Sequence, residues 1–109
     1  MNPLELGKNG EARACEYLKA QGLEILTTNF HSRFGEIDII AQSKETVHFI
    51  EVKASLNYDP IERITQSKYT KILKTIEYYL YRHPVEVDYQ VDAIIIKNNN
   101  VEWIKNISY

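Results

Sequence analysis

The segment Tyr89–Lys97 constrains the fold most, because its centre, Ala93-Ile94-Ile95-Ile96, is an uninterrupted apolar run. Half-buried strands alternate apolar and polar side chains, whereas a continuous apolar run of this length is typical of a strand that is buried on both faces. A final strand, Val101–Ile107, is expected after a turn at Asn98-Asn99-Asn100. A sheet flanked by helices is therefore expected.

The first helix is predicted from signals at both of its ends. Asn2 followed by Pro3, with Glu5 three positions after the asparagine, resembles an N-cap, a proline at the first helical position and a capping acid. The helix is expected to run to Gln21, because Gly22 provides the residue that commonly ends a helix.

A second helix is predicted to end at His83-Pro84, since proline cannot continue a helix. Its start is left open: Asp59-Pro60-Ile61-Glu62 repeats the opening pattern of the first helix, and Thr65 is an alternative N-cap. Its buried side is assigned to the apolar residues Ile61, Ile64, Ile72, Leu73, Ile76 and Leu80.

Three strands are predicted between the two helices. They are Leu23–Thr28, Phe34–Ala41 and Val47–Ala54, and the polar run Gln42–Thr46 is short enough for an antiparallel hairpin. The whole order is helix, three strands, helix and two strands. Since a long helical crossover brings the next strand parallel to a neighbour, an α/β fold with a mixed central sheet is expected.

Length and composition are those of one ordinary globular domain. The chain has 109 residues, 44% of them hydrophobic and 26% charged, so residues 1–109 are assigned to a single domain. Cys15 is the single cysteine, which excludes an internal disulfide and a multi-cysteine zinc site. The N-terminus lacks a basic segment followed by an apolar run, so cytoplasmic residence without a membrane anchor is expected.

Charged side chains interrupt two strands that are otherwise strongly apolar. Asp38 lies within Ile37–Ile40, and Glu51 with Lys53 lies within Phe49–Ala54. Burying charges is costly unless they are paired or bind a metal. Strand side chains alternate, so Glu51 and Lys53 share a face, and Asp38 joins them if the hairpin pairs it opposite Glu51. A slip of one residue would move Asp38 to the other face, and the sequence leaves this register open.

Two converging carboxylates and an ammonium group are typical of a metal-dependent site that cleaves phosphodiesters. Hard cations such as Mg²⁺ or Mn²⁺ prefer carboxylate oxygens, so Asp38 and Glu51 are the candidate ligands. Lys53 could orient the attacking water or offset the charge that builds on phosphorus. Glu11 lies on the apolar side of the first helix and could complete the site.

The remaining polar candidates are assigned structural roles. Glu36 is predicted to face away from Asp38, and Asp92 is expected to pair with a buried cation such as a lysine. His48 is predicted to point outward, and the histidines show no metal-ligand spacing.

The formal net charge of −2 argues against an extended basic surface for nucleic acid. Local patches are still available, because Lys68, Lys71 and Lys74 fall within the second predicted helix, and His31 and Arg33 fall in one short connector. Lys68, Arg33 and His31 are the candidates for contact with nucleic acid.

Two strand segments and the first helix resemble the signature of the bacterial YraN family. They are Arg33-Phe34-Gly35-Glu36-Ile37-Asp38-Ile39-Ile40-Ala41, Phe49-Ile50-Glu51-Val52-Lys53-Ala54 and Gly7-Lys8-Asn9-Gly10-Glu11-Ala12. Lys68 resembles the lysine near the start of that family's second long helix. The resemblance covers nearly the whole chain, although Gln90-Val91-Asp92 stands where relatives tend to carry Arg-Phe-Asp.

That family is similar to the PD-(D/E)XK nucleases and, within them, to the Holliday-junction resolvases. The resemblance implies a three-layer, restriction-endonuclease-like fold and Mg²⁺-dependent hydrolysis of DNA. It assigns the motif's acids to Asp38 and Glu51, its lysine to Lys53 and its helix glutamate to Glu11.

The leading hypothesis is a structure-selective DNA endonuclease that acts on branched intermediates of recombination or repair, as a homodimer if the substrate is a two-fold junction. One alternative is a non-catalytic adaptor that keeps this fold and binds nucleic acid or a protein. Another is a structural domain in which acids such as Glu51 form salt bridges with lysines such as Lys53.

Overall fold

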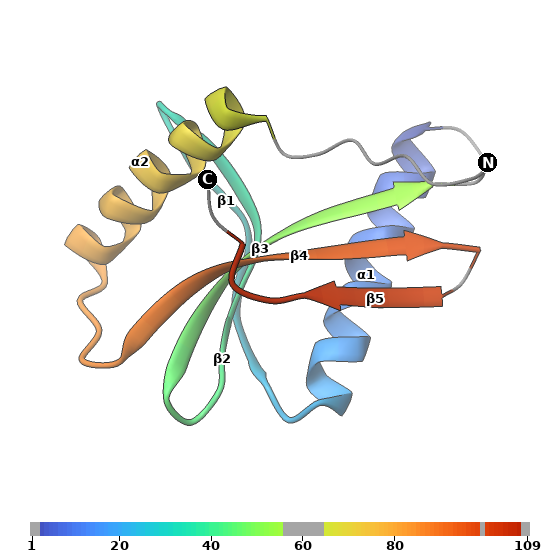
Figure 1. Ribbon diagram of the computed structural model, residues 1–109, viewed down its shortest axis with the longest axis horizontal. Helices are drawn as coiled ribbons and strands as arrows, with labels where there is room; N and C mark the ends of the chain where they lie inside the picture. Colours follow the sequence, from blue (N-terminus) through green and yellow to red (C-terminus); the bar gives the residue numbers. More distant parts are fainter. Residues whose placement is uncertain (1–2, 56–64, 99, 108–109) are drawn as a thin grey trace.

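A computed structural model describes residues 3–55, 65–98 and 100–107, and within them the chain forms two helices and five strands (Figure 1). In chain order the elements are α1 (Pro3–Ala20), β1 (Glu24–Ser32), β2 (Gly35–Gln42), β3 (Thr46–Ser55), α2 (Gln66–Arg82), β4 (Asp88–Lys97) and β5 (Asn100–Ile104). This is the predicted order of helix, three strands, helix and two strands.

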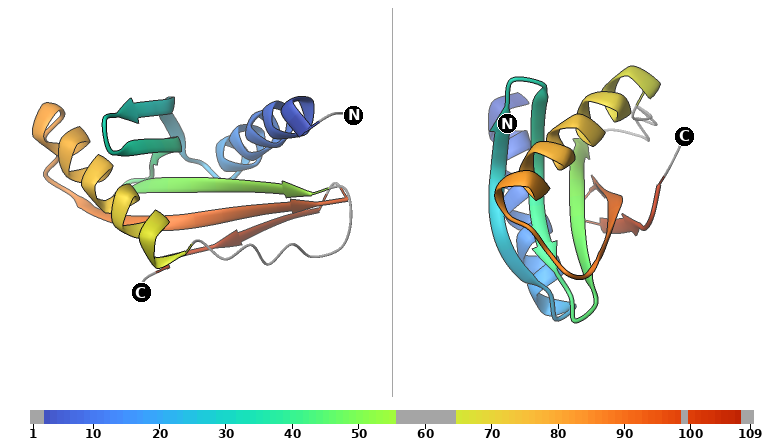
Figure 2. Two further views of the ribbon diagram at one scale, coloured as in Figure 1. Left: turned by 90° about the horizontal axis from the view of Figure 1, so that it is seen from above. Right: turned by 90° about the vertical axis from the view of Figure 1, so that its left-hand side faces the viewer.

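The strands form one mixed sheet in the order β1-β2-β3-β4-β5. β3 and β4 run parallel, whereas the other neighbouring pairs are antiparallel. Because α2 lies in the connection between the two parallel strands, the predicted helical crossover is confirmed. α1 and the start of α2 lie on opposite sides of β3 and β4 (Figure 2). The architecture is the predicted three-layer α/β arrangement, consistent with a nuclease-like fold.

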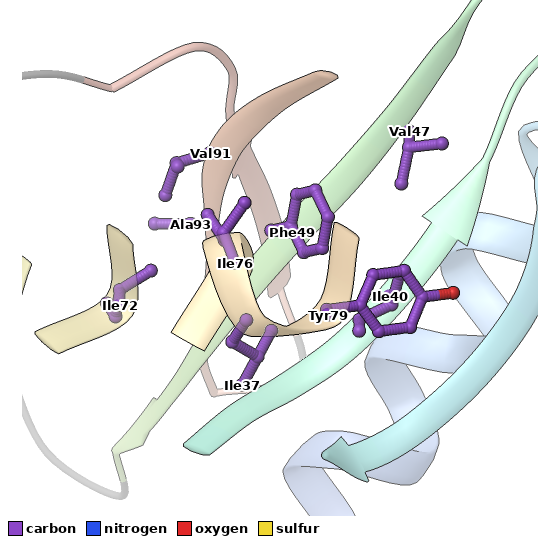
Figure 3. Packing of buried hydrophobic residues seen from close by; sticks show 9 residues of the cluster. All are labelled: Ile37, Ile40, Val47, Phe49, Ile72, Ile76, Tyr79, Val91 and Ala93. Carbon is purple, nitrogen blue, oxygen red and sulfur yellow. The ribbon is translucent and has the colours of Figure 1, made fainter. Parts of the chain in front are cut away.

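Each face of the sheet carries its own apolar cluster, because successive strand residues point to opposite sides. Phe49 packs on the α2 side and its neighbour Ile50 on the α1 side, and Ala93 and Ile94 divide in the same way. The α2-side cluster consists of Ile37, Ile40, Val47, Phe49, Ile72, Ile76, Tyr79, Val91 and Ala93 (Figure 3). The α1-side cluster consists of Ala14, Leu18, Leu23, Ile39, Ala41, Ile50, Ile94 and Ile96. The predicted burial of β4 on both faces is therefore confirmed.

The register of β2 and β3, continued by one residue, would place Asp38 opposite Glu51. The ladder begins with Ile39 opposite Ile50, and one further step in the same register brings the two acids together. The Val52 N–H, one residue further along β3, donates to the Asp38 carboxylate over 2.8 Å. The regular β2–β3 pairing thus ends at the candidate site.

α1 ends as its sequence predicts. Gly22 has a φ of +91°, a conformation that favours glycine, and its N–H donates to the Lys19 carbonyl over 3.0 Å. The Leu23 N–H donates to the Leu18 carbonyl, also over 3.0 Å, which completes a Schellman motif. Leu18 and Leu23 are both buried in the α1-side cluster. The predicted N-cap, Asn2, lies outside the described residues.

α2 begins at the second of its two predicted starts. Thr65 is the N-cap, and its hydroxyl accepts a hydrogen bond from the Lys68 N–H over 3.1 Å. The other start and the two apolar residues assigned to it, within 59–64, lie outside the described residues. Leu73 is 37% exposed, so its assignment to the buried side is wrong; Tyr79 is buried instead.

Within the described residues, neither helix offers an apolar stretch long enough to cross a bilayer.

Two strand predictions are wrong in length. β1 continues to Ser32 instead of stopping at Thr28, because the polar residues assigned to a connector pair with the start of β2. β5 ends at Ile104 instead of Ile107. Asn106 has a φ of +56°, which turns the chain out of the extended conformation.

Candidate active site

A pocket of about 530 Å³ opens where α1, β2, β3 and the N-terminal end of α2 meet. Carboxylates from three of these elements and lysines from two of them line it. The lining consists of Glu11, Gly35, Glu36, Asp38, Glu51, Val52, Lys53, Ala54, Thr65, Ser67, Lys68, Lys71 and Ile72. The pocket therefore gathers groups of both charges that lie far apart in the sequence.

Five of the residues singled out from the sequence line this pocket: Glu11, Asp38, Glu51, Lys53 and Lys68. Asp38 and Glu51 meet through the register of the β2–β3 hairpin. Glu51 and Lys53 meet through the alternation of side chains along β3. The structure thus shows the predicted convergence, whereas the chemical roles of these residues remain predictions.

Gly10 allows α1 to approach β3 closely enough to bring Glu11 to the pocket. A Cβ atom on Gly10 would lie 2.8 Å from the Cβ of Ala54, closer than two carbon atoms can pack. Ala14 and Leu18, further along the same side of the helix, are fully buried. The helix therefore rests on the sheet along this side, with Glu11 at the edge of the pocket.

His31 and Arg33, the other predicted contacts for nucleic acid, lie at the β1–β2 hairpin and do not line the pocket. The His31 Nδ1 atom lies 3.2 Å from a carboxylate oxygen of Glu36, which does line it. The Arg33 guanidinium carbon lies 4.9 Å from the centre of the Phe34 ring. Both residues are exposed, beside the pocket's β2 edge.

Asp38 ionises less readily than an ordinary aspartate. Burial raises its pKa from 3.8 to about 6, and the nearby carboxylates of Glu11 and Glu36 contribute to the rise. The hydrogen bond from the Val52 N–H and the charge of Lys53 act in the opposite direction without offsetting burial. Asp38 is therefore a carboxylate that a bound cation would stabilise strongly in its ionised form.

Glu51 is perturbed in the same direction. Burial raises its pKa from 4.5 to about 7, and the carboxylate of Asp38 adds to the rise, while Lys68 and Lys53 lower it. The residue is 5% exposed, and its Oε1 atom is buried with no hydrogen-bond partner among the described residues. A buried polar atom without a partner costs stability. A cation bound at this oxygen would supply the missing interaction.

The donors present fit a hydrated Mg²⁺ or Mn²⁺ ion. Asp38 and Glu51 provide hard oxygen ligands, and Mg²⁺ usually keeps several water molecules and binds through one or two carboxylates. The described residues contain no group of three His, Cys, Asp or Glu side chains close enough to hold a metal ion. Glu11 therefore lines the pocket without forming a compact three-ligand site with the two acids.

The N-terminal turn of α2 brings positive charge to the same pocket. Ser67, Lys68 and Lys71 line it, and the first turn of the helix contains no acid. Free N–H groups and the helix dipole favour an anion at this end of a helix. The pocket thus places acids suited to a cation next to groups suited to a phosphate.

Two lining residues were not recognised in the sequence as parts of this site. The prediction that Glu36 faces away from Asp38 is wrong, because Glu36 lines the same pocket. Residues two apart along a strand share a face, and this spacing was the available signal. Lys71 follows Lys68 by three residues, the spacing of neighbours on a helix surface, and lines the pocket beside it.

His48 and Asp92 form a buried pair, which contradicts the outward position predicted for His48 and agrees with the structural role predicted for Asp92. His48 is 6% exposed instead of pointing outward, and its Nδ1 atom lies 2.6 Å from Asp92 Oδ2. Asp92 is fully buried and accepts further hydrogen bonds from Trp103 Nε1, Gln90 Nε2 and the Asn106 N–H, over 3.0, 2.8 and 2.8 Å. These donors take the place of the expected lysine. His48 is enclosed by Asp92, by Ser43 and by the Trp103 ring, whose centroid lies 5.5 Å from that of the histidine.

Comparison with known proteins finds relatives over nearly the whole chain. The model described as "Uncharacterised protein family UPF0102" matches residues 10–96. The UPF0102 protein of Campylobacter fetus subsp. fetus is 49% identical over 104 residues, 94% of this chain and 93% of the relative. The UPF0102 proteins of a Nitratiruptor species and of Campylobacter concisus are 50% and 53% identical, over 94% of this chain and 92% of each relative. The chain therefore belongs to the UPF0102 family, which confirms the resemblance to YraN.

Proposed function

We propose that this protein is a metal-dependent endonuclease that hydrolyses phosphodiester bonds in DNA. The observation that carries the proposal is the buried Oε1 atom of Glu51, which has no hydrogen-bond partner among the described residues. It lies in the pocket that Asp38 and two lysines of α2 also line. Hydrolysis of a phosphodiester is favoured by a cation site and a phosphate site that adjoin each other. In this pocket the carboxylates of Asp38 and Glu51 suit the cation, and Lys68 and Lys71 of α2 suit the phosphate.

Each residue of the pocket has a role in this proposal. A bound Mg²⁺ or Mn²⁺ would polarise the scissile phosphate and lower the pKa of an attacking water. Asp38 and Glu51 would bind the cation through carboxylate oxygens, and Glu11 would accept a hydrogen bond from its water shell. Lys53 would orient the attacking water or offset charge on the phosphoryl oxygens, and Lys68 would bind a phosphate of the substrate.

We further propose that the substrate is branched DNA formed in recombination or repair. This part rests on the similarity of the YraN signature to Holliday-junction resolvases. A four-way junction has two-fold symmetry, so its cleavage at paired positions would require a homodimer of this chain. His31 and Arg33, beside the pocket, would contact the DNA backbone.

The test is incubation of the purified protein with labelled four-way junctions, flaps and linear duplexes, with Mg²⁺, with Mn²⁺ or with EDTA. We expect cleavage that requires the metal and that falls by about 100-fold or more in Asp38→Ala, Glu51→Ala and Lys53→Ala. Glu45→Ala, which removes an exposed acid from the β2–β3 turn, is the matched control and should cleave normally. Cleavage that survives Asp38→Ala or Glu51→Ala would refute the proposed site.

A non-catalytic adaptor that binds DNA is the second candidate. It is favoured by one observation, that the described residues hold no compact group of three metal-binding side chains. Calorimetry with Mn²⁺ separates the two candidates. Saturable binding that Glu51→Gln weakens supports the nuclease, whereas DNA binding without metal binding or cleavage supports the adaptor.

A further inference from the structure

A cluster of two cations around one aromatic ring lies outside the pocket. The Arg33 guanidinium carbon is 4.9 Å and the Lys74 ammonium nitrogen 5.8 Å from the centre of the Phe34 ring. Arg33 and Phe34 form the turn between β1 and β2, whereas Lys74 belongs to α2. The electron-rich face of an aromatic ring attracts cations. Phe34 therefore holds side chains from two distant segments near each other.

A hydrogen bond to α2 and another within the turn support the contact between them. The Ser32 hydroxyl lies 3.1 Å from the hydroxyl of Thr75, which is fully buried, and it accepts a hydrogen bond from the Phe34 N–H over 3.0 Å. Gly35 packs on the same side of α2, since a Cβ atom there would lie 3.7 Å from both Lys71 Cβ and Thr75 Oγ1. The tip of the hairpin thus lies against α2 (Figure 1). The backbone on both sides of Arg33 is therefore held next to α2, and the Arg33 side chain is exposed there.

The cluster continues the positive charge of the pocket. Lys68 and Lys71 line the pocket, and Lys74 follows at the same three-residue spacing along α2. At about 1.5 Å per residue the three lysines span about 9 Å. A nucleic-acid strand carries one negative charge per nucleotide, so cations spread over this length of α2 can contact more than one phosphate. Arg33 adds a further cation near Lys74, because both lie close to the Phe34 ring.

We propose that Arg33, Phe34 and Lys74 form a phosphate-binding cluster that holds the DNA strand next to its scissile phosphate. The inference rests on the proposed function. The pocket would bind one phosphate of a DNA strand, and the cluster would bind the phosphates next to it. Arg33 and Lys74 contact the phosphates, and Phe34 is a positioning residue that aligns the two cations. The chain's net charge of −2 makes a general attraction to DNA weak, so an organised local cluster is required.

The experiment measures the affinity of the protein for a short fluorescein-labelled single strand of DNA by anisotropy, in Ca²⁺ and at several KCl concentrations. We expect Arg33→Ala and Lys74→Ala each to weaken binding and to reduce the slope of log affinity against log salt by about 0.7. Phe34→Leu removes no charge, yet it should weaken binding about two- to fivefold with an unchanged slope.

Lys44→Ala is the matched control, because Lys44 is an exposed lysine in the β2–β3 turn, at the other end of β2. It should leave both affinity and slope unchanged, and thermal melting of each variant checks that it is folded. The cluster is refuted if Lys44→Ala weakens binding as much as Arg33→Ala, if Arg33→Ala and Lys74→Ala bind like the parent, or if the parent binds no DNA. A polyglutamate peptide that competes as well as DNA would also overturn it, in favour of an acidic protein partner.

The same variants distinguish this inference from the proposed function. A protein that shows the expected binding pattern but cleaves no substrate supports the cluster and refutes the nuclease. A protein that cleaves DNA with the expected dependence on Asp38, but binds equally well in all cluster variants, refutes the cluster alone.

Discussion

Glu51 combines burial, a raised pKa and an oxygen atom without a hydrogen-bond partner among the described residues. Between pH 4.5, its usual pKa, and about 7, its pKa in the fold, the folded protein keeps a proton that the unfolded chain releases. The free energy of unfolding therefore falls as pH rises through this window. Stability associated with this group is fully present below the window and is lost above it. An ionised Glu51 is thus a destabilising residue in the metal-free protein.

Glu51→Gln should consequently stabilise the metal-free protein at high pH. Each pKa unit corresponds to about 1.4 kcal/mol, so we expect a gain of about 1–3 kcal/mol at about pH 8 that disappears at about pH 4. Urea denaturation in EDTA at the two pH values measures the gain. Glu45→Gln, on the exposed β2–β3 turn, is the control. A variant that is less stable than the parent at high pH would contradict the assignment of Glu51 as an unpartnered buried charge.

The sequence identifies Asp38 and Glu51 readily because an acid in an apolar strand violates the expected pattern. It does not identify the roles of His48 and Asp92, because a histidine in a strand is equally compatible with an outward and a buried position. His48 contacts Asp92 because β3 pairs with β4 in the sheet. These two strands are separated by α2 in the sequence. Information about such distant partners is not present in local patterning.

At the scale of elements, Gly10 determines how closely α1 lies to the sheet. Gly10→Ala would favour the helix intrinsically by up to about 1 kcal/mol, but the added methyl group would meet Ala54 at 2.8 Å. Overpacking of this kind typically costs about 1–3 kcal/mol, so we expect a net loss of stability and a displacement of Glu11.

Ala54→Gly supplies the matched test, because it removes the methyl group that Gly10→Ala would meet. The double variant should recover stability relative to the sum of the single changes, with a coupling of about 1 kcal/mol or more by thermal or urea denaturation. If the changes in stability caused by the two substitutions simply add, the contact between residue 10 of α1 and residue 54 of β3 does not cause the loss of stability in Gly10→Ala.

Asp92, on β4, forms hydrogen bonds to residues of β3, of β5 and of the segment after β5. It accepts hydrogen bonds from His48 on β3, from Trp103 on β5 and from Asn106 beyond it. Asp92→Ala leaves these buried donors without an acceptor, and we expect a loss of about 3 kcal/mol or more. Trp103 is the single tryptophan of the chain, so its fluorescence should shift to the red as the C-terminal segment loosens.

Asp88→Ala, at the exposed start of β4, is the control for this substitution and should leave stability and fluorescence nearly unchanged. A stable Asp92→Ala variant with an unshifted emission spectrum would mean that the hydrogen bonds to Asp92 do not hold the segment in place.

The elements that were predicted well are those with strong local signals. The glycine at the end of α1 and the apolar run of β4 each specify their own conformation, whereas Thr65 is one of two starts that the sequence leaves open for α2. The end of β1 depends on its pairing with β2, and the chain leaves the extended conformation after β5 at Asn106, which has a positive φ. The polar residues at these positions do not indicate either feature. Local chemistry thus predicts that an element is present more reliably than how far pairing extends it.

At the scale of the whole molecule, the pocket holds opposite charges on different elements. The carboxylates of Glu11, Glu36, Asp38 and Glu51 come from α1, β2 and β3, whereas Lys68 and Lys71 come from α2. Burial is the main cause of the raised pKa values of Asp38 and Glu51, and the charges of neighbouring carboxylates add to the rise while nearby lysines lower it. A phosphate that enters without a cation meets repulsion from the same carboxylates. DNA and a divalent cation should therefore bind cooperatively.

The expected coupling is measurable without any cleavage. Ca²⁺ also binds carboxylate and phosphate oxygens, and a coupling of about 1–3 kcal/mol would raise DNA affinity by about 5- to 150-fold. Replacing Asp38 by Asn and Glu51 by Gln together removes both the cation ligands and the repulsion. This double variant should bind DNA more tightly than the parent in EDTA and should gain nothing from Ca²⁺, as anisotropy of a labelled strand would report. Two ligands that share one site must influence each other's affinity. If the parent binds DNA equally well with and without Ca²⁺, the acids and the α2 lysines therefore act on separate ligands.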